Sequence, residues 1–238
     1  MQKENGSSTV IGFVLIFAIL AVLAALYFAA VVPAEEKRAA EVSLIFAKED
    51  MISFSLLLNE LEASPHTPLS YLPVFSDSAA AELTSGGTLS IGNETRSLTK
   101  LVLSTGNSGI GLASGGVFRS DEGDAVWLLH PQISGFGDAV CCILPLYHGS
   151  ISRGTSSGGI PLTAEYLGTV ESVIQSDSPV LMRYVGDDAK LWYAFFYELS
   201  KTYPQAASPV LRGDGADVTL LPKEDMAITI LCPEYLLS

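Results

Sequence analysis

An uncharged and almost wholly apolar run extends from Val10 to Val32. As an α-helix it would be about 35 Å long, which exceeds the roughly 30 Å hydrocarbon core of a bilayer. Lipid offers the backbone no hydrogen-bond partner, so a run of this length crosses a membrane as a helix. The pattern therefore predicts one transmembrane helix over residues 7–33, with the lipid bilayer as its partner.

The same run has a second interpretation, a cleaved secretory signal, because it is N-terminal and ends near the small residues Ala29 and Ala30. Its length, however, is well beyond the apolar core of about 7 to 15 residues that signals carry. The few charges on its two sides nearly cancel, so the positive-inside rule gives no orientation. No second run of spanning length follows, and Asn93 begins an Asn-Glu-Thr glycosylation acceptor sequence. We therefore expect a single-pass protein of the cell membrane whose C-terminal domain is extracytoplasmic, with Asn93 as a candidate glycosylation site.

Beyond the apolar run, apolar residues recur every three or four positions, as on one face of a helix. Pro33 should kink or restart the helix between the two portions. The pattern predicts an amphipathic stem helix over residues 34–63, ended by Ser64-Pro65. Charged residues lie off its packing seam, which consists of Leu44, Ala47, Met51, Phe54, Leu58 and Leu61.

Further apolar residues widen this stem surface beyond what a two-helix contact needs: Ile45, Ile52, Leu56 and Leu57. Two interpretations follow for the seam. It packs on the β-domain of its own chain, or it packs against the stems of neighbouring subunits. Both can hold on different faces of the helix.

After Tyr71 short apolar runs rich in β-branched and aromatic residues alternate with Gly, Ser and Pro, which predicts an antiparallel sheet domain. The aromatic run KLWYAFFYEL, residues 190–199, is expected to be one of its strands. Residues 162–176 have apolar side chains at helical spacing and are expected to form a short helix. The Gly- and Ser-rich stretch 149–159 is expected to be an exposed loop. The fold class is therefore α+β: a long N-terminal helix, then a mainly antiparallel β-domain over residues 64–238.

Composition excludes several classes of protein. Hydrophobic residues make up 48% of the 238 residues and charged residues only 16%, which excludes a disordered chain. The formal net charge is −13, and a nucleic-acid partner is not expected because a phosphate backbone needs a positive surface. Three cysteines are too few for a disulfide scaffold.

No residue pattern in the chain indicates a catalytic, cofactor or metal site. Cys141-Cys142 admits a vicinal disulfide or a pairing with Cys232, but two buried thiols are the simpler interpretation in an apolar strand. Acidic residues cluster in turns without the spacing of a calcium loop. The histidines His66, His130 and His148 are isolated, and each is expected to be a surface residue or a residue whose hydrogen bonds are satisfied. The aromatic residues form either core or a carbohydrate-binding face: Trp127, Trp192, Tyr193, Phe195, Phe196 and Tyr197. We expect no enzyme and no cofactor.

The N-terminal pattern resembles archaeal type IV pilin-like proteins. The likeness covers about the first 60 residues: a short polar leader ending in Gly6, the apolar run beginning Val10-Ile11-Gly12-Phe13, and an amphipathic helix before a β-rich domain. The resemblance implies a leader over residues 1–6 that a prepilin peptidase removes between Gly6 and Ser7. It also implies assembly with copies of itself or with other pilin-like subunits.

Two functions from different classes follow. The first is a membrane-anchored structural or assembly subunit of a type IV pilin-like kind at the cell surface. The alternative is a membrane-tethered ligand-binding module, for instance for carbohydrate. An exposed aromatic row beside an acidic pocket would favour the binding module.

Overall fold

The computed structural model describes residues 5–63, 69–71, 80–105, 107–136, 139–153, 162–176, 178–203, 206–221 and 226–238. The chain divides into two compact units, Met1–Val42 and Ser43–Ser238. The second unit begins inside the predicted stem, so most of the stem belongs to the same unit as the β-domain. The fold class is α+β, as expected from the sequence.

One continuous helical stretch opens the chain and consists of three segments: α1 (Asn5–Leu26), the π-helical turn η1 (Tyr27–Val31) and α2 (Val32–Ala63). Pro33 has no backbone N–H to donate to the carbonyl of Ala29, four residues earlier. The π-helical turn lies directly before it, and the Val32 N–H bonds to the carbonyl of Tyr27. Pro33 is thus accommodated by a local change of helix type, and the helix continues through it.

The smaller sheet has six strands, in the order β1-β11-β15-β8-β7, with β9 also paired to β15. Its strands pair antiparallel except that β8 and β9 both run parallel to β15. The bounds of the six strands are β1 (Leu69–Tyr71), β7 (Gln132–Phe136), β8 (Ala139–Ile143), β9 (Leu146–Gly149), β11 (Leu162–Ser176) and β15 (Met226–Leu237).

The larger sheet has nine strands and is antiparallel throughout, in the order β13-β14-β12-β2-β3-β4-β5-β6, with β10 also paired to β2. The bounds of the nine strands are β2 (Ala80–Ile91), β3 (Glu94–Thr105), β4 (Ser108–Ala113), β5 (Gly116–Asp121), β6 (Asp124–Leu129), β10 (Ser152–Arg153), β12 (Val180–Val185), β13 (Val210–Arg212) and β14 (Gly215–Leu220).

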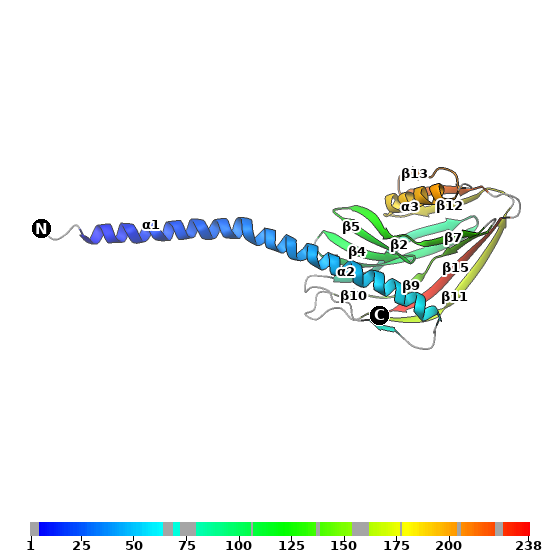
Figure 1. Cartoon of the computed structure of the whole chain (residues 1–238), viewed down its shortest axis with the longest axis horizontal. Coiled ribbons are helices and arrows are strands. Elements are labelled where there is room, and N and C mark those ends of the chain that lie inside the picture. The colour runs from blue at the N-terminus through cyan, green and yellow to red at the C-terminus, as the bar shows by residue number, and fades with distance from the viewer. Residues whose placement is uncertain are drawn as a thin grey trace. The chain divides into compact units, whose positions relative to one another are not determined.

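Side chains from both sheets and from two helices fill the core, which consists of two main clusters. One core cluster contains buried residues of β2, β12, β14, β8 and β15 and of helix α3 (Ala189–Thr202). The other contains buried residues of α2, β3, β4, β9, β11 and β15. In Figure 1, β11 and β15 run side by side, while α3 lies beside β12 and β13. Each helix therefore buries one face against the sheets, as an amphipathic helix should.

The expected helix over residues 162–176 is wrong: this segment is the strand β11. It pairs with β15 residue by residue from Ala164↔Leu237 to Ser176↔Met226, with one bulge between Tyr166 and Gly168. The run contains many β-branched residues, and the long ladder to β15 outweighs the helical spacing of a few apolar positions.

The expected strand over KLWYAFFYEL is also wrong: these residues form α3. The buried side chains Leu191, Trp192, Phe195, Phe196 and Leu199 recur at helical spacing. Aromatic content suggested a strand, but burial of one helical stripe decides the structure. In the expected loop 149–159, Ser152–Arg153 forms β10, which pairs with β2, and residues 154–159 lie outside the described residues.

Candidate functional site

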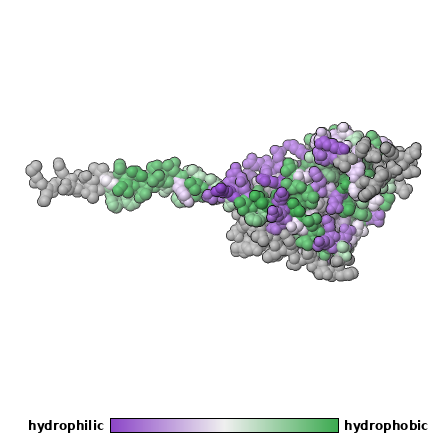
Figure 2. Space-filling view, viewed as in Figure 1, coloured by the Kyte–Doolittle hydropathy of each residue, from purple (hydrophilic) through white to green (hydrophobic). Residues whose placement is uncertain are grey.

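The surface of the N-terminal helix is apolar on all sides. From Gly12 to Val31 every residue of the helix is exposed, including Phe13, Leu20 and Phe28, which is 68% exposed. Figure 2 shows this apolar helix surface in green, and the hydrophilic residues that follow it along the chain in purple. Within the described residues this helix is the one segment long and apolar enough to cross a membrane. A helix that is apolar all round needs lipid or other apolar helices around it, because water does not solvate it favourably.

The predicted cleavage point lies at the start of this helix. Gly6 and Ser7 fall in the first turns of α1, which begins at Asn5, and residues 1–4 of the predicted leader lie outside the described residues.

The packing seam of the stem lies in the core of the second unit. Leu44, Ala47, Met51, Phe54, Leu58 and Leu61 are all buried, each at most 6% exposed. They share one cluster with residues of both sheets, such as Leu101 and Tyr235. This face of the stem therefore packs on the β-domain of its own chain.

Polar groups also hold the stem to both sheets. The hydroxyl of Ser55, itself buried, donates to the carbonyl of Gly115 at 3.2 Å, in the turn between β4 and β5. The hydroxyl of Tyr235 on β15 donates to the carbonyl of Leu58 at 2.9 Å. Burial raises the pKa of Tyr235, so its proton stays in place at neutral pH. Ser55 lies four residues after Met51 and three before Leu58, on the same face of the helix. Its burial could therefore have been predicted from helical spacing, although Ser55 is not an apolar residue.

The opposite face of the stem carries exposed apolar side chains. Ile45 is 56% exposed, Phe46 is 53% exposed and Leu56 is 54% exposed. Ile52, which was expected to widen the apolar surface, is half-buried against the core. The structure thus separates the two interpretations by face: one face is covered by the chain itself, and the other remains uncovered within the described residues.

The aromatic residues of α3 are divided between core and surface. Trp192, Phe195 and Phe196 are buried, whereas Tyr193 and Trp127 are half-buried and Tyr197 is 46% exposed. Tyr193, Tyr197, Trp127 and His130 line a shallow hollow of about 330 Å³.

The rings in this hollow are already engaged. Tyr193 and Tyr197 stack on each other, and the Lys201 ammonium lies 4.3 Å from the centre of the Tyr197 ring. The indole N–H of Trp127 donates to the carbonyl of Leu191 at 2.9 Å. The face of the Tyr197 ring that lies under the Lys201 ammonium is therefore not available for a sugar to stack on.

The acidic turns form a second shallow hollow, of about 390 Å³, at the start of α3. Asp187, Asp188 and Asp214 contribute to its lining. The carboxylate of Asp188 forms an ion pair with the Lys100 ammonium at 2.6 Å. Among the described residues no group of three or more acidic, histidine or cysteine side chains is placed to hold a metal ion.

The cysteines are free thiols. Cys142 and Cys232 are buried, and Cys141 is half-buried. Burial raises the pKa of Cys142 to about 12, so this thiol stays protonated and unreactive at neutral pH. Of the histidines, His130 and His148 are exposed, and His148 lies 3.7 Å from Glu234. His66 lies outside the described residues.

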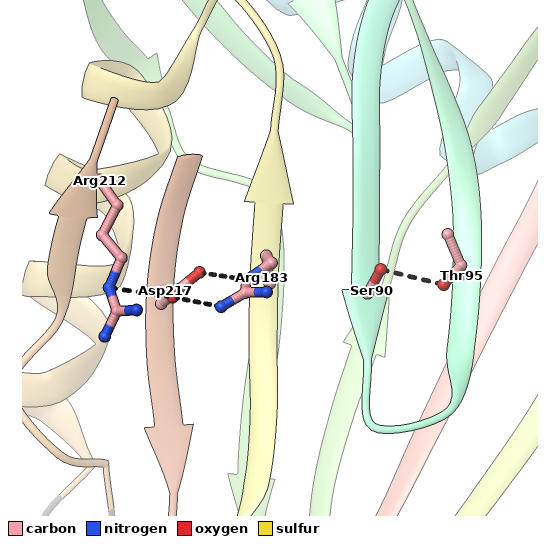
Figure 3. Close-up of polar contacts among 5 residues, drawn as sticks. All are labelled: Ser90, Thr95, Arg183, Arg212 and Asp217. Carbon is pink, nitrogen blue, oxygen red and sulfur yellow. Dashed lines mark hydrogen bonds and ion pairs between the residues drawn. The ribbon is translucent and has the colours of Figure 1, made fainter. Parts of the chain in front are cut away.

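One carboxylate, Asp217 on β14, is buried between two arginines (Figure 3). Arg183 on β12 donates twice to it, at 2.8 and 2.9 Å, and Arg212 on β13 lies 3.8 Å away. The hydrogen bonds from Arg183 hold the pKa of Asp217 below its usual range. In the same row across the sheet, the hydroxyls of Ser90 and Thr95 bond to each other at 2.9 Å. We call the group of Arg183, Asp217 and Arg212 the cross-strand brace, because it links three neighbouring strands. The sequence did not indicate it, because Arg183 and Asp217 are 34 residues apart along the chain.

Asn93, the candidate glycosylation residue, is exposed in the two-residue turn between β2 and β3. Gly92 precedes it with φ +58°, the left-handed conformation that such a hairpin turn requires.

Comparison of the chain with models of protein families, with curated proteins and with solved structures finds no match.

Proposed function

We propose that this chain is a pilin-like, membrane-anchored surface subunit with no enzymatic role of its own. The observation that carries the proposal is the N-terminal helix, which is uncharged and exposed on all sides from Gly12 to Val31. In a bilayer these side chains contact lipid. In an assembly they contact the same helix of neighbouring subunits, and the resemblance to pilin-like proteins favours that second partner.

The uncovered face of the stem supports the same proposal. Exposed Ile45, Phe46 and Leu56 give a neighbouring subunit apolar surface to cover, whereas the seam around Phe54 is already used within the chain. Burying apolar side chains of this size contributes about 1.5 to 3 kcal/mol each. The stem therefore has one face for its own domain and one for a partner subunit.

Imaging cells for filaments that carry this chain, combined with N-terminal sequencing of the filament subunit, tests the proposal. The expected subunit begins at Ser7, and Gly6→Glu blocks processing by a prepilin peptidase because a bulky charge replaces the small residue before the cut. Ser8→Ala serves as a control that leaves Gly6 intact. Filaments without this chain, or a mature chain that keeps Met1, would contradict pilin-type processing and assembly while leaving membrane anchoring to a separate test.

The alternative function, a tethered carbohydrate-binding module, has less support. The hollow beside α3 brings Tyr193, Tyr197 and Glu198 together, but the tyrosine rings already contact each other and Lys201. The acidic hollow at the start of α3 holds Asp188 in an ion pair with Lys100.

A further inference from the structure

The strand β11 has an edge that is paired along only part of its length. On one side β15 pairs with it from Ala164 to Ser176. On the other side β1 pairs with Leu162 to Ala164 alone. Among the described residues nothing pairs with the outer edge of β11 from Val170 to Ser176, a ladder of about 24 Å at 3.4 Å per residue.

The hydrogen bonds of β15 show which backbone groups of β11 point outward. The Leu144 N–H bonds to the Leu231 carbonyl, so the backbone N–H and C=O groups of Leu231 point toward β8 and β9. The backbone groups of the adjacent residues Ile230 and Cys232 therefore point toward β11, where these residues pair with Ser172 and Val170. The backbone N–H and C=O groups of Glu171, Val173 and Gln175 then point away from β15, and within the described part of the chain no strand bonds to them.

Other outer strands of the two sheets are protected in ways that this edge is not. The edge strand β13 is only three residues long, and it ends in Arg212. The edge strand β6 is joined to α3 by the bond from the Trp127 indole to Leu191. From Val170 to Ser176, β11 has no proline or lysine, and Glu171 is its one charged residue. Short length, charge and a covering helix are the usual protections of an edge, so an edge without them is a site for strand addition.

Exposed apolar side chains accompany the free backbone groups. Val173 is 54% exposed on the outer face of the sheet, and Val170 on the inner face is 43% exposed. Exposed β-branched side chains on an open edge are well suited to cross-strand packing against a second strand.

We propose that a second copy of this chain pairs with this edge, so that β11 of one subunit lies antiparallel to β11 of the other about a two-fold axis at Val173. In this register Val173 faces its own copy, and Glu171 pairs with the uncharged Gln175 of the other subunit. The register uses the whole run from Val170 to Ser176. A two-fold axis at Glu171 would instead place two carboxylates opposite each other, which is unfavourable. The two six-stranded sheets then join into one continuous sheet.

The backbone pattern fits this register. The outward-pointing N–H and C=O groups belong to Glu171, Val173 and Gln175, and the two-fold axis at Val173 pairs these positions with each other. An isologous contact of this kind closes on itself as a dimer. The β11–β11 contact does not involve the N-terminal helix, so it can be tested separately from the proposed pilin-like assembly.

Disulfide trapping in the full chain, purified in detergent, tests the pairing and its register. A residue opposite its own copy in a hydrogen-bonded pair has a Cα separation of about 5.5 Å, within the range of a disulfide. Val173→Cys should therefore give covalent dimers several-fold above the native chain, whose own cysteines include the buried Cys142 and Cys232. Glu171→Cys should not trap itself, but should trap Gln175→Cys when the two variants are mixed. Equal trapping by Val173→Cys and Glu171→Cys would overturn the register.

A matched pair of lysine substitutions tests the contact without a disulfide. Val173→Lys places two like charges at the centre of the pairing and should halve the protein mass in sedimentation, from dimer to monomer. Leu167→Lys is the control, because Leu167 is similarly exposed, at 51%, but lies on the bulge outside the paired run. Both variants should keep the circular dichroism spectrum of the native chain. A native chain that is monomeric, or a dimer that survives Val173→Lys, would contradict the proposal, since the second result assigns association to the N-terminal helix.

Discussion

Asp217 is the charged residue that lies deepest among the described residues, with 6% of its surface exposed. Its bidentate bond to Arg183 compensates the burial of the carboxylate, so loss of the charge should destabilise the fold. We expect Asp217→Asn to lower the free energy of unfolding by about 1 to 2 kcal/mol, toward the low end of the range because Arg183 is itself 45% exposed. Asp121→Asn is the control: it removes a similar pair with Arg119 that is exposed on both sides, and should cost less than about 0.5 kcal/mol.

The pH dependence of this brace has a definite sign. The bonds from Arg183 lower the pKa of Asp217, so the folded protein holds this carboxylate ionised below the ordinary aspartate value of about 4. The stabilisation is complete above that value and is lost as the pH falls through the lower pKa of the folded state. Urea titrations between about pH 3 and 7 should therefore show that the difference in free energy of unfolding between the native chain and Asp217→Asn becomes smaller as the pH falls. An equal deficit at every pH would mean that the carboxylate acts by packing alone.

At the scale of elements, the stem helix has buried and exposed positions that should respond differently to substitution. Phe54 is 1% exposed in the core cluster, while Glu49 on the same helix is exposed. We expect Phe54→Asp to cost about 3 to 5 kcal/mol, since it buries an unpaired charge, and Glu49→Lys to have little effect. Thermal unfolding of the full chain in detergent measures both. If Phe54→Asp changes only the oligomer size and leaves the unfolding temperature unaltered, the seam belongs to contacts between subunits and not to the core.

The stem was predictable from sequence because its seven-residue periodicity is long and regular, and burial of one face then follows. Segments β11 and α3 were not, because both carry aromatic or β-branched residues whose spacing fits either a helix or a strand over short distances. Tertiary contacts decide both segments. The strand β11 gains a ladder to β15, whose paired residues lie fifty or more positions later, and α3 places Trp192 and Phe196 in a core built by both sheets. The brace at Asp217 and the anchor from Tyr235 to Leu58 also join residues far apart in sequence, so no local pattern marks them.

At the scale of the whole molecule, the two units have different surfaces. The first unit contains an uncharged helix exposed from Gly12 to Val31, and the second contains a β-domain with its own core. Our central claim is that the helix holds the chain in the membrane and that the β-domain is displayed outside the cell.

Protease treatment of intact cells tests that claim most directly. With an epitope tag after Ser238, we expect added protease to remove the tagged β-domain from intact cells, while a cytoplasmic marker protein survives the same treatment. Extraction with carbonate should leave the untreated chain in the membrane fraction. Full protection of the tag until the cells are lysed would contradict the orientation, and release of the chain by carbonate would contradict the anchor.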